Sequence, residues 1–289
     1  ASHGCCFDYG VAVDGWGKSG DATVIIKEPF GSATTVYQNK FTHSYEKGSH
    51  SGHIASFGRA LNQVGRAMNL VGMDVDMAGK IMGMQAYGKS SPMVLDSREE
   101  ICRSFIDELV SFNGDKTFDN QEWLNLVSTL HRHWIETLES LVLAYVPQSA
   151  RVVFSGGAIQ NTIFNERILK LYPNAVFVPH CYDGGLSLGV LHQMCLTYGK
   201  KLPVVSGYPY LQRDEITDEP SRETIRKVAQ MLADGKIVGW HQGKGEIGPR
   251  ALGNRSILMN PAISNGKAIL NNRVKHREHW RPYAASVLE

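Results

Sequence analysis

The chain has 289 residues, enough for one large domain or two smaller ones. Hydrophobic residues make up 43% of it and charged residues 20%, which is a globular composition and excludes a mainly disordered chain. The net charge of +2 argues against a mainly electrostatic nucleic-acid binder, and no apolar run approaches the roughly 20 residues that span a bilayer.

The first half of the sequence predicts a sheet followed by helices. Runs of β-branched and aromatic residues predict short strands at 9–15, 21–28 and 34–41, the last two as a meander or hairpin. Apolar residues recur at spacings of three and four over 53–72 and 121–146, which predicts two amphipathic helices. The segment 78–89, punctuated by glycines, lies between these helices.

Two successive strand–Gly-Gly–helix units follow, at 151–173 and 175–196. Their repetition predicts an α/β architecture with parallel strands. Residues 198–220 have no strong periodicity and carry several prolines, which is typical of a linker. A helix that ends near Gly235 and a strand that runs into a loop come next. We therefore expect a second domain to begin near residue 205.

The two Gly-Gly turns indicate a nucleotide site. A glycine turn that opens a helix lets the backbone approach a ligand and points amides at it, which suits phosphate. Asn161 would cap the helix or contact a sugar, and Asp183 would bind a ribose hydroxyl or a metal. Tight strand–helix packing is the alternative explanation. The turns contain Gly156, Gly157, Gly184 and Gly185. Neither the Rossmann fingerprint nor a P-loop pattern is present.

Three side chains form a candidate metal site. Asp14 closes an apolar strand, and His3 lies eleven residues before it. With Asp183 they make a mixed nitrogen and oxygen donor set of the kind that suits iron, manganese or zinc. The alternative is that Asp14 and the glycine after it only form a turn.

A glycine-framed basic segment lies at 241–261. Lys244, Arg250 and Arg255 fall within twelve residues, and Glu246 is expected to be an internal partner. Arginine forks match phosphate or carboxylate oxygens, so the segment predicts a pocket for a small phosphorylated or acylated anion. The segment 271–288 adds Arg273, Lys275, Arg277 and Arg281. Internal salt bridges are one alternative, and nucleic-acid contact, which the near-neutral total charge disfavours, is another.

The stretches HQGKGEIGPRALGNRSILMNP and NNRVKHREHWRPYAASVLE closely resemble the C-terminal region of the O-carbamoyltransferase family. That family includes nodulation carbamoyltransferases and enzymes that carbamoylate cephem and aminoglycoside antibiotics. Four upstream stretches resemble family segments in the same order: VAVDGWG, AGKIMGMQAYGK, VVFSGGAIQNTIFNERIL and YDGGLSLGV. The resemblance therefore covers nearly the whole chain.

The resemblance implies an α/β protein with two parts. Residues 1–204 would form a partial actin-like ATPase (ribonuclease H-like) domain. Residues 205–289 would begin a C-terminal domain, α+β in class, that is similar to carbamoyl-adenylate synthases. Family members use carbamoyl phosphate and ATP to make carbamoyl-adenylate, and then transfer the carbamoyl group to a hydroxyl group, here on a small molecule.

The resemblance also assigns residues to these tasks. The residues implied in catalysis are Lys244, Arg250 and Arg255. These three would also bind carbamoyl phosphate, together with Ser256 and Arg281. The two Gly-Gly turns, Asn161, Asp183 and Lys80 would bind ATP. The metal, Fe²⁺ or Mn²⁺ with Mg²⁺ as a third option, would be held by His3, Asp14 and Asp183. No residue identifies itself as the general base, and His53 and His180 qualify only by residue type.

Several expectations concern the whole protein. The chain enters a strand almost at once without a Met and stops inside an apolar run, so we expect a piece of a longer protein. Five cysteines without a disulfide pattern predict reduced thiols and a cytoplasmic location. A homodimer is among the expectations. Two other functions stay open, a related carbamoylating enzyme of maturation or tRNA modification and a non-catalytic nucleotide-binding module.

Overall fold

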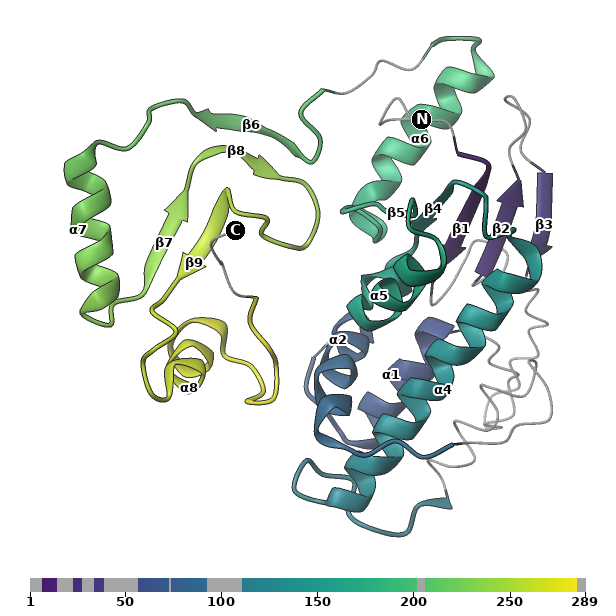
Figure 1. Cartoon of the computed structure of the whole chain (residues 1–289), viewed down its shortest axis with the longest axis horizontal. Coiled ribbons are helices and arrows are strands. Elements are labelled where there is room, and N and C mark those ends of the chain that lie inside the picture. The colour runs from purple at the N-terminus through teal and green to yellow at the C-terminus, as the bar shows by residue number, and fades with distance from the viewer. Residues whose placement is uncertain are drawn as a thin grey trace. The chain divides into compact units, whose positions relative to one another are not determined.

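The computed structural model describes residues 7–14, 23–27, 34–38, 57–72, 74–92, 111–201 and 206–284. The chain divides into two compact units, residues 5–186 and residues 187–289. Figure 1 draws the first mainly from purple to teal and the second in green and yellow. This division lies earlier than residue 205, and the domain boundary expected there stays a prediction.

The first unit is built on one mixed sheet with the strand order β3-β2-β1-β4-β5. β1 pairs in parallel with β4, and β4 pairs in parallel with β5, whereas β2 is antiparallel to both of its neighbours. The predicted meander and the predicted parallel strands are both confirmed. The strands are β1 (Tyr9–Val13), β2 (Thr23–Lys27), β3 (Thr34–Gln38), β4 (Val152–Ser155) and β5 (Val176–Phe177).

The longest helix, α4, follows the predicted pattern closely. The Asn120 side chain caps its first turn by accepting from the N–H groups of Glu122 and Trp123. Pro147 follows its last turn. Its apolar stripe is buried from Val127 to Leu141. The helical elements of this unit are α1 (Phe57–Ala67), α2 (Asp74–Met84), η1 (Gln85–Tyr87), α4 (Gln121–Tyr145), η2 (Gly157–Gln160), α5 (Thr162–Leu171) and η3 (Asp183–Gly185).

The core of this unit holds the ends of the central strands in place. Alternate residues of β1 are buried, as the pleat of a strand requires: Tyr9, Val11 and Val13. In α4, Trp134 is fully buried and makes a T-shaped ring contact with Phe164 of α5. Each large apolar side chain buried in this way contributes about 1.5–3 kcal/mol. This packing fixes where the loops that follow β1 and β4 begin.

The second unit contains two antiparallel strand pairs, β6 with β8 and β7 with β9. The helix α7 ends as predicted, with Gly235 just beyond it at a φ of 78°. The helix α6 crosses the boundary between the units. The elements are α6 (Leu186–Thr197), β6 (Tyr210–Ile216), α7 (Arg222–Ala233), β7 (Val238–His241), β8 (Gly243–Glu246), β9 (Arg255–Leu258), α8 (Gly266–Leu270) and the π-helical turn η4 (Asn271–Lys275).

The prediction of a linker at 198–220 was wrong for the second half of this segment, where the strand β6 lies. β6 pairs with β8, Tyr210 opposite Glu246 and Ile216 opposite Gly243. Backbone hydrogen bonds to a segment some thirty residues away hold this polar strand, and local periodicity cannot reveal such pairing. Within the described ranges, no helix has the length and hydropathy needed to cross a membrane.

Candidate functional site

The first candidate site lies at the carboxyl edge of the central strands. β1 and β4 are parallel neighbours, and Ala12 pairs with Ser155. Asp14 follows β1, and the Gly156–Gly157 turn follows β4, so both leave the sheet at the same edge. β5 is the parallel neighbour of β4 and leads to the second glycine turn. In parallel sheets this edge is where ligands bind.

Gly156 has to be a glycine at this position. Its φ is 96°, and a Cβ built on it would lie 2.1 Å from the carbonyl oxygen of Val13. A Cβ on Gly157 would lie 3.2 Å from Oδ1 of Asp14. The close packing that the sequence left open as an alternative is therefore present, and it also places the Asp14 carboxylate directly beside the turn.

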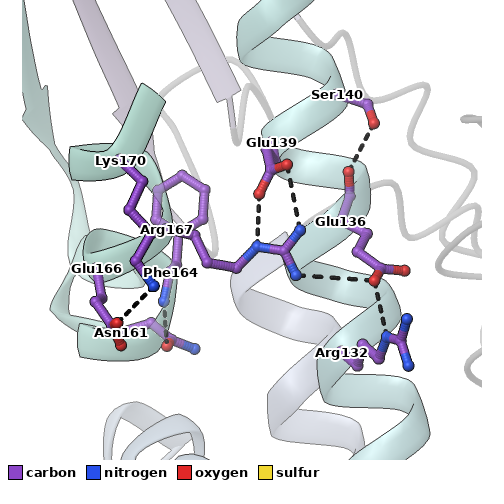
Figure 2. Close-up of polar contacts among 9 residues, drawn as sticks. All are labelled: Arg132, Glu136, Glu139, Ser140, Asn161, Phe164, Glu166, Arg167 and Lys170. Carbon is purple, nitrogen blue, oxygen red and sulfur yellow. Dashed lines mark hydrogen bonds and ion pairs between the residues drawn. The ribbon is translucent and has the colours of Figure 1, made fainter. Parts of the chain in front are cut away.

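Asn161 ties this turn to the two helices behind it. Its Oδ1 accepts from the N–H of Phe164 at 3.2 Å, the N-terminal cap of α5 drawn in Figure 2. Its Nδ2 lies 2.9 Å from Nε2 of His131 on α4, and both residues are buried. The predicted capping role is confirmed. Both polar atoms of this side chain have partners inside the unit. The alternative contact with a sugar stays a prediction.

His131 is a buried partner of Asn161 that the sequence analysis missed. Burial lowers the pKa of its imidazole to about 4, so the ring is neutral near pH 7. Because Nδ2 of Asn161 is a donor, Nε2 of His131 is the unprotonated acceptor. One signal was available in the sequence: His131 lies four residues after Val127 and three before Trp134, on the buried stripe of α4.

The second glycine turn forms η3, in which Asp183 is exposed. A Cβ on Gly185 would lie 2.2 Å from the carbonyl oxygen of His180, so this turn is also tightly closed. His180 is thus placed beside the turn, whereas His53 lies outside the described residues.

The predicted metal set is only partly described. His3 lies outside the described residues. Within them, no three His, Cys, Asp or Glu side chains gather closely enough to hold a metal ion. Asp14 follows β1 and Asp183 follows β5, so the two carboxylates come after different parallel strands of the sheet. The metal stays a prediction.

Lys80 is buried on α2 rather than displayed to solvent. Its Nζ donates to the carbonyl oxygen of Val71, just beyond α1. This contact ties the segment that follows α1 to α2. Its predicted contact with a nucleotide stays a prediction.

The second candidate site is the glycine-rich loop, residues 243–256, which runs from β8 into β9. It contains no helix, as predicted. Gly243, Gly248 and Gly253 have φ values of 55°, 102° and 113°. Side-chain-bearing residues rarely adopt these values, and here they let the loop turn back on itself.

Glu246 lies at the centre of the loop and its side chain is fully buried. Its Oε1 accepts from the N–H of Leu252 at 2.6 Å and from the N–H of Asn254 at 2.7 Å. Its Oε2 lies 3.1 Å from Nε of Arg255. Burial raises the pKa of this carboxyl, but the backbone N–H groups bonded to it and the Arg255 charge outweigh burial and hold the pKa below its ordinary value.

The three predicted cations differ in their surroundings. Arg255 is half-buried and donates to Glu246 and to the carbonyl oxygen of Gly248. Arg250 and Lys244 are exposed. Within the described part of the chain, no hydrogen bond or ion pair holds the Arg250 side chain. The expected internal role of Glu246 is confirmed, and anion contact by the three cations stays a prediction.

Of the two remaining predicted residues, Ser256 is the last residue of the loop and Arg281 lies beyond it. Ser256 is on β9, opposite Trp240 of β7. Arg281 lies 3.8 Å from Oε2 of Glu278. Near Arg281 the buried Asn271 accepts from Arg277 at 3.1 Å and from the Tyr283 hydroxyl at 2.7 Å. The basic segment 271–283 thus has internal partners of its own.

The sequence comparisons give this part of the chain a family. The profile of the carbamoyltransferase C-terminus matches residues 229–289, which include β7, the glycine-rich loop and β9. These residues therefore carry a carbamoyltransferase C-terminal domain. A 3'-hydroxymethylcephem-O-carbamoyltransferase of Streptomyces clavuligerus is 29% identical over 227 residues, 72% of this chain and 43% of the relative.

Two further relatives show a similar level of sequence identity. The nodulation protein NolNO of Sinorhizobium fredii is 34% identical over 158 residues, 48% of this chain and 23% of that protein. The uncharacterized protein MJ1058 of Methanocaldococcus jannaschii is 30% identical over 249 residues, 73% of this chain and 41% of that protein. The chain thus spans less than half the length of these relatives.

Proposed function

We propose that the chain contributes to an ATP-dependent O-carbamoyltransferase that acts on a hydroxyl group of a small molecule. In the proposed first stage, carbamoyl phosphate, ATP and one water give carbamoyl-adenylate, pyrophosphate and phosphate. In the second stage the acceptor oxygen bonds to the carbamoyl carbon, AMP leaves, and the hydroxyl proton is lost. Similarity to two 3'-hydroxymethylcephem-O-carbamoyltransferases supports this reaction class.

The observation that carries the proposal is the glycine-rich loop. It lies inside the region that matches the carbamoyltransferase C-terminus, and it displays Lys244 and Arg250 around a framework held by a buried carboxylate. Cations held rigidly beside a leaving phosphate stabilise its charge without reorganising during the reaction. We assign Lys244, Arg250 and Arg255, with Ser256 and Arg281, to the carbamoyl phosphate site, in which Arg255 acts by holding the loop.

We place ATP at the carboxyl edge of the first unit. The strand order β3-β2-β1-β4-β5, with β2 antiparallel to its neighbours, supports an actin-like, ribonuclease H-like fold for this unit. The Gly156–Gly157 and Gly184–Gly185 turns, with Asp14 and Asp183 beside them, would bind the nucleotide at this edge. Asn161 and Lys80 would contribute to the same nucleotide site.

The proposal also includes a bound divalent metal ion. His3, Asp14 and Asp183 would hold Fe²⁺, Mn²⁺ or Mg²⁺, and the carboxylates of Asp14 and Asp183 suit any of these ions. Such an ion would supply positive charge that polarises the carbamoyl carbonyl. The chain's own part is to place Asp14 against the first glycine turn.

The experiment that tests the proposal measures pyrophosphate release by the purified protein that carries these residues. We expect release that needs both ATP and carbamoyl phosphate and that is lost in Arg250→Gln. Binding of ATP without any turnover, across a panel of hydroxylated acceptors, would instead favour a non-catalytic nucleotide-binding module.

A further inference from the structure

The glycine-rich loop is built around a single buried carboxylate. Oε1 of Glu246 holds the backbone of Leu252 and Asn254, on the returning side of the loop. Oε2 holds the guanidinium of Arg255, at the start of β9. The two oxygens of one side chain therefore fix three separate points of the loop. Removing a carboxylate from water is costly unless every oxygen has partners, and here each one does.

Other contacts close the loop around Glu246. Arg255 also donates to the carbonyl oxygen of Gly248, on the outgoing side of the loop. The side-chain amide of Asn254 donates to the carbonyl oxygen of Lys244 at 2.8 Å, which joins β8 to the residue that precedes β9. Arg250 lies between these anchored points, and its own side chain is exposed.

From these contacts we infer that Glu246 is a positioning residue for the anion site and acts by holding the loop segment that presents Arg250. Arg255 is the partner through which Glu246 holds the outgoing side of the loop. The inference rests on the proposed function, because it takes Arg250 to be a cation that meets the phosphate of the donor. Arg250 is thus assigned to contact with the anion, and Arg255 is assigned to holding the loop.

A double-mutant cycle on anion binding tests this inference. The probes are carbamoyl phosphate and, separately, inorganic phosphate, titrated calorimetrically into native protein, Glu246→Gln, Arg250→Gln and the double variant. We expect each single variant to weaken binding about tenfold to a hundredfold. We also expect the double variant to bind no more weakly than Arg250→Gln, because Glu246 acts only through the loop that carries Arg250.

Three results would overturn the inference. Additive losses in the cycle would mean that Glu246 and Arg250 act independently. A folded Glu246→Gln that binds both anions as well as native protein would mean that the carboxylate positions nothing. A native protein that binds neither anion counts against the inference in the same way.

Arg255→Lys provides a second route if Glu246→Gln does not fold. Lysine keeps the charge but cannot donate to Glu246 and Gly248 as a planar fork does. We expect Arg255→Lys to weaken binding and to be non-additive with Arg250→Gln. Losses that add would show that Arg255 meets the anion directly.

The double-mutant cycle measures binding without turnover. It therefore tests the positioning role of Glu246 separately from the proposed carbamoyl transfer. Non-additive losses with no pyrophosphate release would support the positioning role and contradict the proposed function. Pyrophosphate release with additive losses would do the reverse.

Discussion

Arg250 and Arg255 lie five residues apart in one motif but have different surroundings. Arg255 is bonded to a buried carboxylate, so substituting it disturbs the loop itself. Arg250 is exposed, so substituting it removes a charge and leaves the framework intact. This contrast allows binding and folding to be measured separately.

Arg250→Gln should weaken carbamoyl phosphate binding about tenfold or more without lowering the midpoint of thermal unfolding, because only an exposed charge is lost. Lys227→Gln is the matched control, an exposed cation of α7 outside the motif. It should change neither property. Calorimetric titration and thermal unfolding of both variants check this. Equal losses in the two variants would mean that the charge acts only at long range.

His131 should make the first unit less stable as the pH falls. Its pKa is about 4 when folded, against 6.5 for an ordinary histidine, so between these values the unfolded chain binds a proton that the folded chain does not. The free energy of unfolding should therefore fall by up to about 3 kcal/mol from pH 6.5 to pH 4.

His131→Gln, which keeps a hydrogen-bond acceptor but does not titrate, should flatten this dependence in urea unfolding measured between pH 4 and 7. His192→Gln, on α6, serves as the control and should keep the native slope. A His131→Gln slope equal to that of native protein would show that other groups cause the pH dependence.

At the residue scale, local relationships were predictable and distant ones were not. Asn161 as a helix cap and Glu246 as an internal partner both follow from neighbouring residues, and both are confirmed. The bond between Asn161 and His131 joins residues 30 apart and depends on how α5 packs against α4. Spacing within one helix could place His131 on a buried face but could not name its partner.

At the element scale, the turn after β4 depends on one glycine. Gly156→Ala should destabilise the first unit by about 3 kcal/mol or more, since a Cβ would meet the Val13 backbone at 2.1 Å and the φ is 96°. Gly189→Ala is the control, because a Cβ there has nothing within 4 Å. It should be neutral or slightly stabilising in its helix. Chemical unfolding of both variants decides the point, and a native-like Gly156→Ala would contradict the described turn.

The helices α4 and α5 are also joined by a charged contact. Figure 2 shows Arg167 of α5 reaching Glu139 of α4, with nitrogen–oxygen distances of 2.6 and 3.2 Å, and approaching Glu136 at 3.8 Å. These hydrogen bonds raise the pKa of Arg167, which favours its charged form. The contact supports the orientation of α5, whose first turn follows the Gly156–Gly157 turn.

Arg167→Gln should lower the free energy of unfolding of the first unit by about 1 kcal/mol, the value typical of a well-formed but partly exposed pair. Lys170→Gln removes an exposed pair with Glu166 within α5 and should leave stability unchanged. Unfolding in urea at low and high salt provides the measurement. An equal effect in both variants would mean that the contact between the helices adds nothing.

Elements with strong local patterns were predicted well, and those formed by distant pairing were not. The stripe of α4 and the two strand–Gly-Gly–helix units match the structure because periodicity and glycine placement define them locally. β6 was missed because its polar residues gain order only by pairing with β8. The closed shape of the glycine-rich loop likewise depends on contacts across it, centred on Glu246.

At the scale of the whole molecule, the proposed function gives nucleotide binding to the first unit and anion binding to the second, where the carbamoyltransferase C-terminus matches. The strand order could not be derived from spacing alone, since it depends on which strands pair across the sheet. The acceptor, the homodimer and the cytoplasmic location stay predictions. The chain spans 43% or less of the relatives described above, so the activity is a property to be measured on the protein that carries it.

The most direct measurement follows the carbamoyl carbon. Purified protein is mixed with carbamoyl phosphate labelled with ¹³C at the carbonyl and with ATP, and the nucleotide products are analysed by mass spectrometry. We expect ¹³C-labelled carbamoyl-adenylate together with pyrophosphate, both absent in Arg250→Gln. Unlabelled AMP or ADP as the only nucleotide product would show that the carbamoyl group is not transferred to the adenylate.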